Sequence, residues 1–217
     1  MDYFLARLPI FKKLPSAELS DLPRQFLLRR YRRQEPIFQE GDPPAAVFLL
    51  RSGLVKAVKY SPRVAPFAME VIVPGKLFGM IAALDGRPYP VSAVPIKECE
   101  AYRIPARAFE NLMKGHSDFS REVYAEVGSH LRQSQSMRSL SKEPVEKRIA
   151  FILCLLARSM GNDLPVRRED IAELSGCTQE TAIRTLVDFR NKKLLSSGWK
   201  KIVVLKPDRL KALSGMK

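Results

Sequence analysis

The stretch Val166–Val204, which reads VRREDIAELSGCTQETAIRTLVDFRNKKLLSSGWKKIVV, decides the fold of the C-terminal part of this chain. Arg168–Leu174 has a helix-forming composition and leads into the short segment Ser175-Gly176-Cys177. We expect a second helix to begin at Thr178, because a threonine hydroxyl can cap the free backbone N–H groups of a first turn. Two helices joined by a short, glycine-containing turn are typical of the helix-turn-helix of DNA-binding proteins.

The second of these helices is predicted to have a buried and an exposed face. Its apolar positions at helical spacing are Ala182, Leu186 and Phe189. The residues expected to reach base edges in the major groove are Gln179, Glu180, Ile183 and Arg184. Glu180 and Arg184 are four apart, a spacing that allows an ion pair along a helix. Leu194-Leu195, a turn at Gly198 and Ile202–Leu205 then predict a hairpin that forms a wing.

The composition agrees with a soluble protein that binds a polyanion. The chain has 217 residues, of which 46% are hydrophobic and 28% charged, which excludes wholesale disorder and fibrous repeats. Its formal net charge is +14, and residues 144–217 carry half of that charge in about a third of the length. A basic C-terminal module favours nucleic acid as partner.

Three widely separated cysteines predict reduced thiols in a cytoplasmic protein. Cys99, Cys154 and Cys177 form no CxxC pair, so neither a disulfide framework nor a cysteine-only metal site is expected. No apolar run approaches the roughly 20 residues that span a bilayer, and no signal peptide is expected, so we predict no membrane association.

The N-terminal part changes from helical to β periodicity. Residues 16–26 are expected to form a helix with Ser16 as its N-cap. From about Leu27 to Pro105, short β-rich runs alternate with Gly and Pro, which favours a sandwich or barrel. The predicted runs are Ala46–Arg51, Leu54–Tyr60, Met69–Val73 and Val91–Ile96, with the segment Ser52-Gly53 as a turn between the first two.

Helical periodicity returns after Pro105. A short helix is predicted over Pro105–Lys114 and a long one from Ser117 to about Leu140. The long helix carries two apolar stripes: Phe119/Val123/Val127, expected on the β domain, and Tyr124/Val127/Leu131, expected in a dimer interface. Beyond Leu131 the second stripe becomes polar. This is compatible either with a dimer interface whose strength is tuned by a ligand or with a helix end that frays into a solvated hinge.

Domain boundaries follow from these elements. Ser141 is a candidate N-cap for a helix over Lys142–Met160 that ends at Gly161-Asn162-Asp163. We therefore predict a sensing domain over 1–116, a long dimerisation helix and hinge over 117–141, and a DNA-binding domain over 142–217.

Taken together, these segments resemble the CRP/FNR family of bacterial transcription regulators (cyclic-AMP receptor protein type). The resemblance is without gaps from about Arg167 to Val204 and extends to the IFQEGDPP and LLRSGLVK segments and to the long helix. It implies an α+β fold: an N-terminal double-stranded β-roll of the cyclic-nucleotide-binding type, a dimerising helix and a C-terminal winged helix-turn-helix. Carried over by position, Glu180 and Arg184 would read bases. The residues expected on phosphates are Arg168, Thr178 and Thr181, with Lys200 in the wing. Gln179 departs from the family's frequent Arg, so the half-site sequence does not carry over.

The same resemblance argues against cyclic AMP as the effector. Family members that bind cyclic nucleotides hold the phosphate and ribose with a Glu and an Arg in one loop, which corresponds to Gly79–Val91 here. Met80 occupies the Glu position and Tyr89 the Arg position, so both charged partners are missing. Arg87 could substitute only from another point on the loop.

Other sensors have weaker support. An iron–sulfur regulator would need a cysteine cluster near the N-terminus, whereas the first cysteine is Cys99. A haem sensor would need an axial ligand, and His116 and His130 are the only histidines. For an unidentified small molecule, the predicted pocket residues are Met80, Tyr89, Val91, Ser134 and Gln135.

The sequence therefore predicts a dimeric, sequence-specific DNA-binding regulator controlled by an effector other than cyclic AMP, with no enzymatic site. Its expected partners are double-stranded DNA with a near-palindromic operator, a second copy of the chain, RNA polymerase and an unidentified small-molecule or gas effector. No cofactor is identified. The alternatives are a β-roll regulatory subunit of an enzyme and a haem-based gas-sensing regulator.

Overall fold

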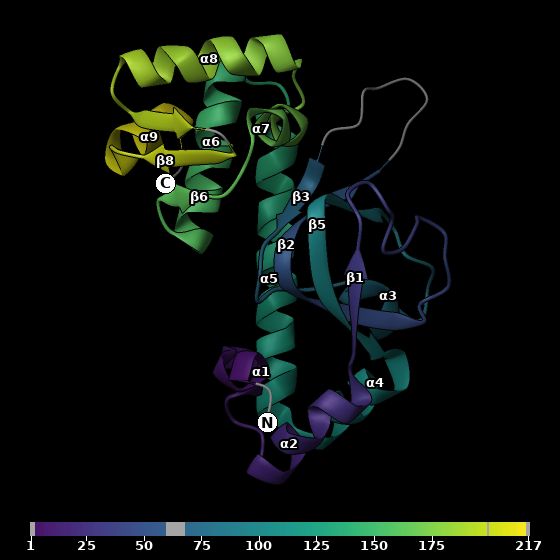
Figure 1. Ribbon diagram of the computed structural model, residues 1–217. Helices are drawn as coiled ribbons and strands as arrows, with labels where there is room; N and C mark the ends of the chain where they lie inside the picture. Colours follow the sequence, from purple (N-terminus) through teal and green to yellow (C-terminus); the bar gives the residue numbers. More distant parts are fainter. Residues whose placement is uncertain (1–2, 60–67, 199, 216–217) are drawn as a thin grey trace. The chain divides into compact units, whose positions relative to one another are not determined.

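The computed structural model describes residues 3–59, 68–198 and 200–215 (Figure 1). The described residues fall into two compact units, the first drawn from Met1–Ala57 and Ile72–Ser134 and the second from Val58–Val71 and Gln135–Lys217. No described helix is long and apolar enough to cross a membrane. The predicted boundaries of the three functional segments stay predictions.

A five-stranded sheet forms the centre of the N-terminal part. Its strands are β1 (Leu27–Tyr31), β2 (Ala46–Val58), β3 (Ala68–Ile72), β4 (Leu77–Phe78) and β5 (Ser92–Pro105). The order is β1-β5-β2-β3, and β4 pairs with β2. β1 runs antiparallel to β5, from Leu27 opposite Arg103 to Tyr31 opposite Cys99.

The predicted turn at Ser52-Gly53 is wrong, because both residues lie inside the continuous strand β2. Gly53 has φ +93°, and a Cβ atom there would lie 2.4 Å from the Cβ of Cys99 on β5. The glycine therefore marks a close approach of two strands and not a chain reversal. The two runs predicted on either side of it form one strand, except that Lys59 lies beyond its end and Tyr60 lies outside the described residues.

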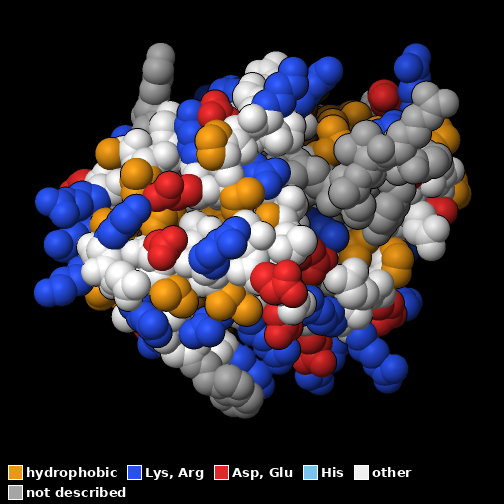
Figure 2. Space-filling model, turned by 90° about the horizontal axis from the view of Figure 1, so that it is seen from above, with side chains coloured by type: hydrophobic (Ala, Val, Ile, Leu, Met, Phe, Trp, Pro, Cys, Tyr) orange, Lys and Arg blue, Asp and Glu red, His pale blue; other side chains and the backbone are white. Residues whose placement is uncertain are grey.

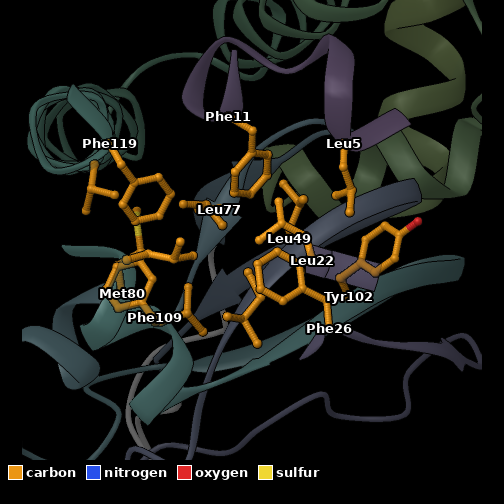
Figure 3. Close-up of a cluster of buried hydrophobic side chains, with 14 of the residues drawn as sticks. Leu5, Phe11, Leu22, Phe26, Leu49, Leu77, Met80, Tyr102, Phe109 and Phe119 are labelled. Carbon is orange, nitrogen blue, oxygen red and sulfur yellow. The ribbon is translucent and has the colours of Figure 1, made fainter. Parts of the chain in front are cut away.

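Over Ala46–Leu50, the side chains of β2 alternate between two hydrophobic cores, as the period of a strand requires. Val47 and Leu49 belong to the helix-side core, drawn in part in Figure 3. This core contains Leu5, Phe11, Leu14, Leu22, Phe26, Val47, Leu49, Leu77, Met80, Tyr102, Ile104, Phe109, Leu112, Phe119 and Val123. Phe48 and Leu50 belong to the roll core on the other side. The roll core contains Tyr31, Phe38, Ala46, Phe48, Leu50, Val55, Ala57, Ile72, Phe78, Ala82, Tyr89, Ala93, Cys99 and Ala101.

Helices contribute the other side of the helix-side core. They are α1 (Tyr3–Arg7), a 3-10 turn (Pro9–Phe11), α2 (Ser16–Gln25), α3 (Met80–Asp85), α4 (Ala106–Gly115) and α5 (Ser117–Leu140). The predicted bounds of α5 are confirmed. The predicted N-cap of α2 is off by one residue: Pro15 is the cap and its carbonyl accepts the N–H of Leu19. Ser16 is already helical.

The second unit contains the remaining elements. They are α6 (Val145–Met160), β6 (Asp163–Leu164), α7 (Arg168–Ser175), α8 (Gln179–Asn191), β7 (Leu195–Gly198), β8 (Lys201–Val204) and α9 (Pro207–Ser214). β6, β8 and β7 form an antiparallel sheet in that order. The wing is therefore a three-stranded sheet, because Asp163, expected only to end a helix, forms with Leu164 a strand that pairs with β8.

The predicted N-cap of α6 is also wrong. Ser141 follows the end of α5, where its hydroxyl donates to the carbonyl of Arg138 at 2.7 Å. The cap of α6 is Pro144, whose carbonyl accepts the N–H of Arg148 at 3.1 Å. Helical geometry thus begins only after the proline, since the residue that precedes a proline is disfavoured in the α conformation.

Candidate nucleic-acid interface

The first helix of the helix-turn-helix is tied down at both ends. At its start, the carboxylate of Asp170 accepts the backbone N–H of Arg167 at 2.8 Å, and Asp170 is buried. At its end, the Ser175 hydroxyl donates to the carbonyl of Ile171 at 2.6 Å. Gly176 follows with φ +60°, a left-handed conformation that glycine adopts at little cost. These contacts set the direction in which the chain enters α8.

The predicted cap of α8 is confirmed. The hydroxyl oxygen of Thr178 accepts the backbone N–H of Thr181 at 3.3 Å, and the two threonine hydroxyls lie 2.9 Å apart. Loss of such a cap costs about 1 kcal/mol. The cap holds the first turn of α8 in place, which is the turn that carries Gln179 and Glu180.

The two faces of α8 are as the sequence predicts. Ala182, Leu186 and Phe189 are buried. Gln179, Glu180, Ile183 and Arg184 are all exposed. The helix is labelled α8 in Figure 1, and the surface drawn in Figure 2 carries many Lys and Arg side chains among acidic and hydrophobic ones.

The expected ion pair within α8 is not formed. Within the described residues, neither Glu180 nor Arg184 makes a hydrogen bond or ion pair with another side chain. Both charged side chains can therefore bind an external partner, and no ion pair between them has to be broken first.

The residues predicted to contact phosphates come from α7, from the start of α8 and from the wing turn. Arg168, at the start of α7, donates from its guanidinium to the Ser197 hydroxyl on β7 at 3.4 Å, so it bridges the helix-turn-helix to the wing. Lys200 lies in the wing turn with φ +57°. The next residue, Lys201, pairs with Asp163 of β6 at 2.7 Å. The Arg168–Ser197 contact joins residues 29 positions apart, and no local pattern in the sequence indicated it.

The predicted effector residues are placed in different parts of the fold. Met80 is buried in the helix-side core, whereas Tyr89 is buried in the roll core. Val91 packs partly buried against the roll core. Ser134 and Gln135 fall in different compact units. The structure thus does not bring Met80 and Tyr89 together in the wall of one pocket, and the effector pocket stays a prediction.

Tyr89 is held firmly in the roll core. Its ring stacks on Phe38 with 3.9 Å between centroids, and Phe48 and Phe78 extend this aromatic cluster. The backbone N–H of Ala46 donates to the phenol oxygen at 3.2 Å, and the phenol donates to the carbonyl of the same residue. Burial raises the pKa of Tyr89, so the ring stays neutral. The Tyr89 side chain itself offers no positive charge to a phosphate.

The long helix α5 leaves one of its two stripes uncovered. Phe119 and Val123 are buried in the helix-side core, as predicted, and Val127 packs against it. Tyr124 is 62% and Leu131 60% exposed. Tyr124 and Leu131 of the second stripe are thus available to a partner, whereas Val127, which belongs to both stripes, is partly covered.

Both histidines face carboxylates. The Nε2 atom of His116 lies 2.6 Å from Glu18, and that of His130 lies 3.4 Å from Glu126. Among the described residues, no group of three or more His, Cys, Asp or Glu side chains could hold a metal ion. Cys99 is buried, while Cys154 and Cys177 are partly exposed.

Both parts of the chain match known protein families. Residues 28–116 match the cyclic nucleotide-binding domain family, and residues 147–213 match the Crp-like helix-turn-helix domain family. Similar proteins include a CRP-like cAMP-activated global transcriptional regulator of Mycobacterium tuberculosis (25% identical, covering 97% of this chain and 98% of the relative) and the transcriptional activator protein anr of Pseudomonas aeruginosa (28%, covering 86% and 80%).

The fold agrees with solved structures. FixK2 from Bradyrhizobium japonicum superposes with a TM-score of 0.75 at 23% identity, covering 87% of this chain and 96% of that one. The predicted α+β fold, with an N-terminal β-sheet domain, intervening helices and a C-terminal helix-turn-helix, is therefore confirmed.

Proposed function

Since the chain belongs to the CRP/FNR family of DNA-binding transcription regulators, we propose that it acts as a homodimer on a near-palindromic operator and answers to an effector other than cyclic AMP. The observation that carries the first part is the exposed face of α8. A capped helix, packed on α7, presents Glu180 and Arg184 with no competing partner in the described part of the chain. RNA polymerase would be the further protein partner of such a regulator.

In this proposal α8 enters the major groove. Arg184 donates two hydrogen bonds to O6 and N7 of a guanine, and Glu180, one turn earlier, accepts from the exocyclic amine of a cytosine. Gln179 and Ile183 complete the reading face. Arg168, Thr178, Thr181 and Lys200 hold the flanking phosphates, which orients the helix without reading sequence.

Dimerisation would come from α5. Its Tyr124/Val127/Leu131 stripe is apolar and largely uncovered, and a two-fold reader needs two recognition helices roughly 34 Å apart. Pairing of two α5 helices would bury the stripe and supply the two-fold axis that a near-palindromic operator mirrors.

Two side chains support an effector other than cyclic AMP. Met80 and Tyr89 stand where nucleotide-binding members of the family have Glu and Arg, and both are buried in hydrophobic cores. A cyclic phosphate entering beside Tyr89 would meet an aromatic cluster in place of a guanidinium, at the full cost of its desolvation.

The experiment compares two arginine substitutions. Arg184→Ala and Arg168→Ala are assayed by competition binding against a randomised operator library at two salt concentrations. Arg184→Ala is expected to cost about 1–3 kcal/mol per half-site and to relax base preference at one position. Arg168→Ala is expected to weaken all sequences alike and to reduce the salt dependence by about one unit of slope. Equal loss on every sequence for Arg184→Ala would assign its contact to phosphate and refute the reading scheme.

A further inference from the structure

One apolar side chain stands on the charged reading face of the helix-turn-helix. Ile183 is 40% exposed, and it is the only exposed large hydrophobic residue of α8, all of which the structure describes. It follows Glu180 by three residues, which places both on the same side of the helix, and it directly precedes Arg184 on the exposed face. Its Cβ-branched shape gives no benefit to the helix, in which isoleucine is a weaker former than alanine or lysine.

The apolar side chain has only one favourable partner in the major groove. Base edges there present hydrogen-bond donors and acceptors, and the C5-methyl group of thymine is the single apolar group among them. Against the edge of guanine, cytosine or adenine, Ile183 would strip water from polar atoms without replacing their hydrogen bonds. Against thymine it would remove two apolar surfaces from water.

We infer that Ile183 contacts the C5-methyl group of a thymine in each half-site, beside the base pair that Arg184 reads. This inference rests on the proposed DNA-binding function and deepens it, because it assigns a specific base to a residue that makes no hydrogen bond. Specificity at this position comes from a single methyl group.

Deoxyuridine tests the contact directly, since it differs from thymidine only by the missing methyl. An operator is first selected from random DNA with the full-length chain, and each thymine is then replaced in turn by deoxyuridine. We expect one thymine per half-site at which the replacement weakens binding about fourfold, and roughly tenfold or more when both half-sites are changed. All other thymines should tolerate the replacement.

Three variants assign the effect to Ile183. Ile183→Ala keeps the helix, because the side chain is exposed and alanine is a better helix former, and it should bind thymine and deoxyuridine operators equally. Ile183→Val should retain part of the discrimination. Leu213→Ala truncates another exposed apolar residue of the same unit, 37% exposed on α9, and should discriminate as the unchanged protein does.

The outcomes separate this inference from the function on which it rests. If selection yields an operator but no thymine is sensitive to deoxyuridine, or if Ile183→Ala keeps the sensitivity, the inference is overturned and DNA recognition stands. If selection yields no preferred sequence, the proposed function fails and this inference fails with it.

Discussion

Leu131→Glu on α5 is expected to convert the protein from a dimer to a monomer and to weaken operator binding with it. The residue is 60% exposed in the single chain and stands on the same stripe as Tyr124. If two α5 helices pair along this stripe, the two Leu131 side chains are buried together. Glutamate would place two like charges there.

The size of the effect follows from the exposed fraction. Full burial of a leucine side chain contributes about 1.5–3 kcal/mol, so burying the 60% that is exposed contributes roughly 1–2 kcal/mol per protomer. The dimer contains this contact twice, so its loss alone should raise the dimer dissociation constant roughly thirty-fold to several-hundred-fold. Repulsion and desolvation of the two carboxylates add to this loss.

Sedimentation velocity over a range of protein concentrations measures the change, and gel shifts with the selected operator measure its effect on DNA. Ser129→Glu is the matched control, because it adds the same charge to the same helix at an exposed position on the other side. This control should stay dimeric. A Leu131→Glu protein that sediments as a dimer with the affinity of the unchanged chain would show that the stripe is not the interface.

Three further predictions concern the N-terminal part. Calorimetry should detect no micromolar binding of cyclic AMP, since two missing charged contacts of about 1.5–3 kcal/mol each weaken it by orders of magnitude; a micromolar dissociation constant would contradict this. Burial by itself would raise the pKa of Glu126, but the neighbouring His130 and Lys76 outweigh burial and hold it below its usual value near 4.5. The stabilisation from Glu126 is therefore present above that value and lost as the pH falls through the lower folded pKa. In urea denaturation at a series of pH values, Glu126→Gln should reduce the loss of unfolding free energy at acidic pH. Burial raises the pKa of the Cys99 thiol to about 12, so alkylation near pH 8, followed by mass spectrometry, should modify Cys99 only after denaturation.

Local patterns in the sequence determined the long helix and the reading face. The bounds of α5 follow from periodicity, and the start of α8 follows from Thr178, whose hydroxyl caps the next turn. Each signal involves residues within a few positions of one another, so it is complete in the sequence. The exposed face of α8 is predictable for the same reason, because a 3.6-residue period separates buried from exposed positions.

Contacts between distant residues could be decided only by the tertiary structure. Gly53 resembles a turn residue, but it lies within β2. A glycine is required there because Cys99 of β5 approaches too closely for any side chain. Asp163-Leu164 becomes a strand only because β8, about 40 residues later, supplies its hydrogen bonds. Tyr89 is predicted to stand at a position where nucleotide-binding relatives have an Arg, but only the fold shows that its phenol binds the Ala46 backbone and its ring stacks on Phe38. Local propensity contains no information on such pairings, since their free energy arises only when segments far apart in the chain meet.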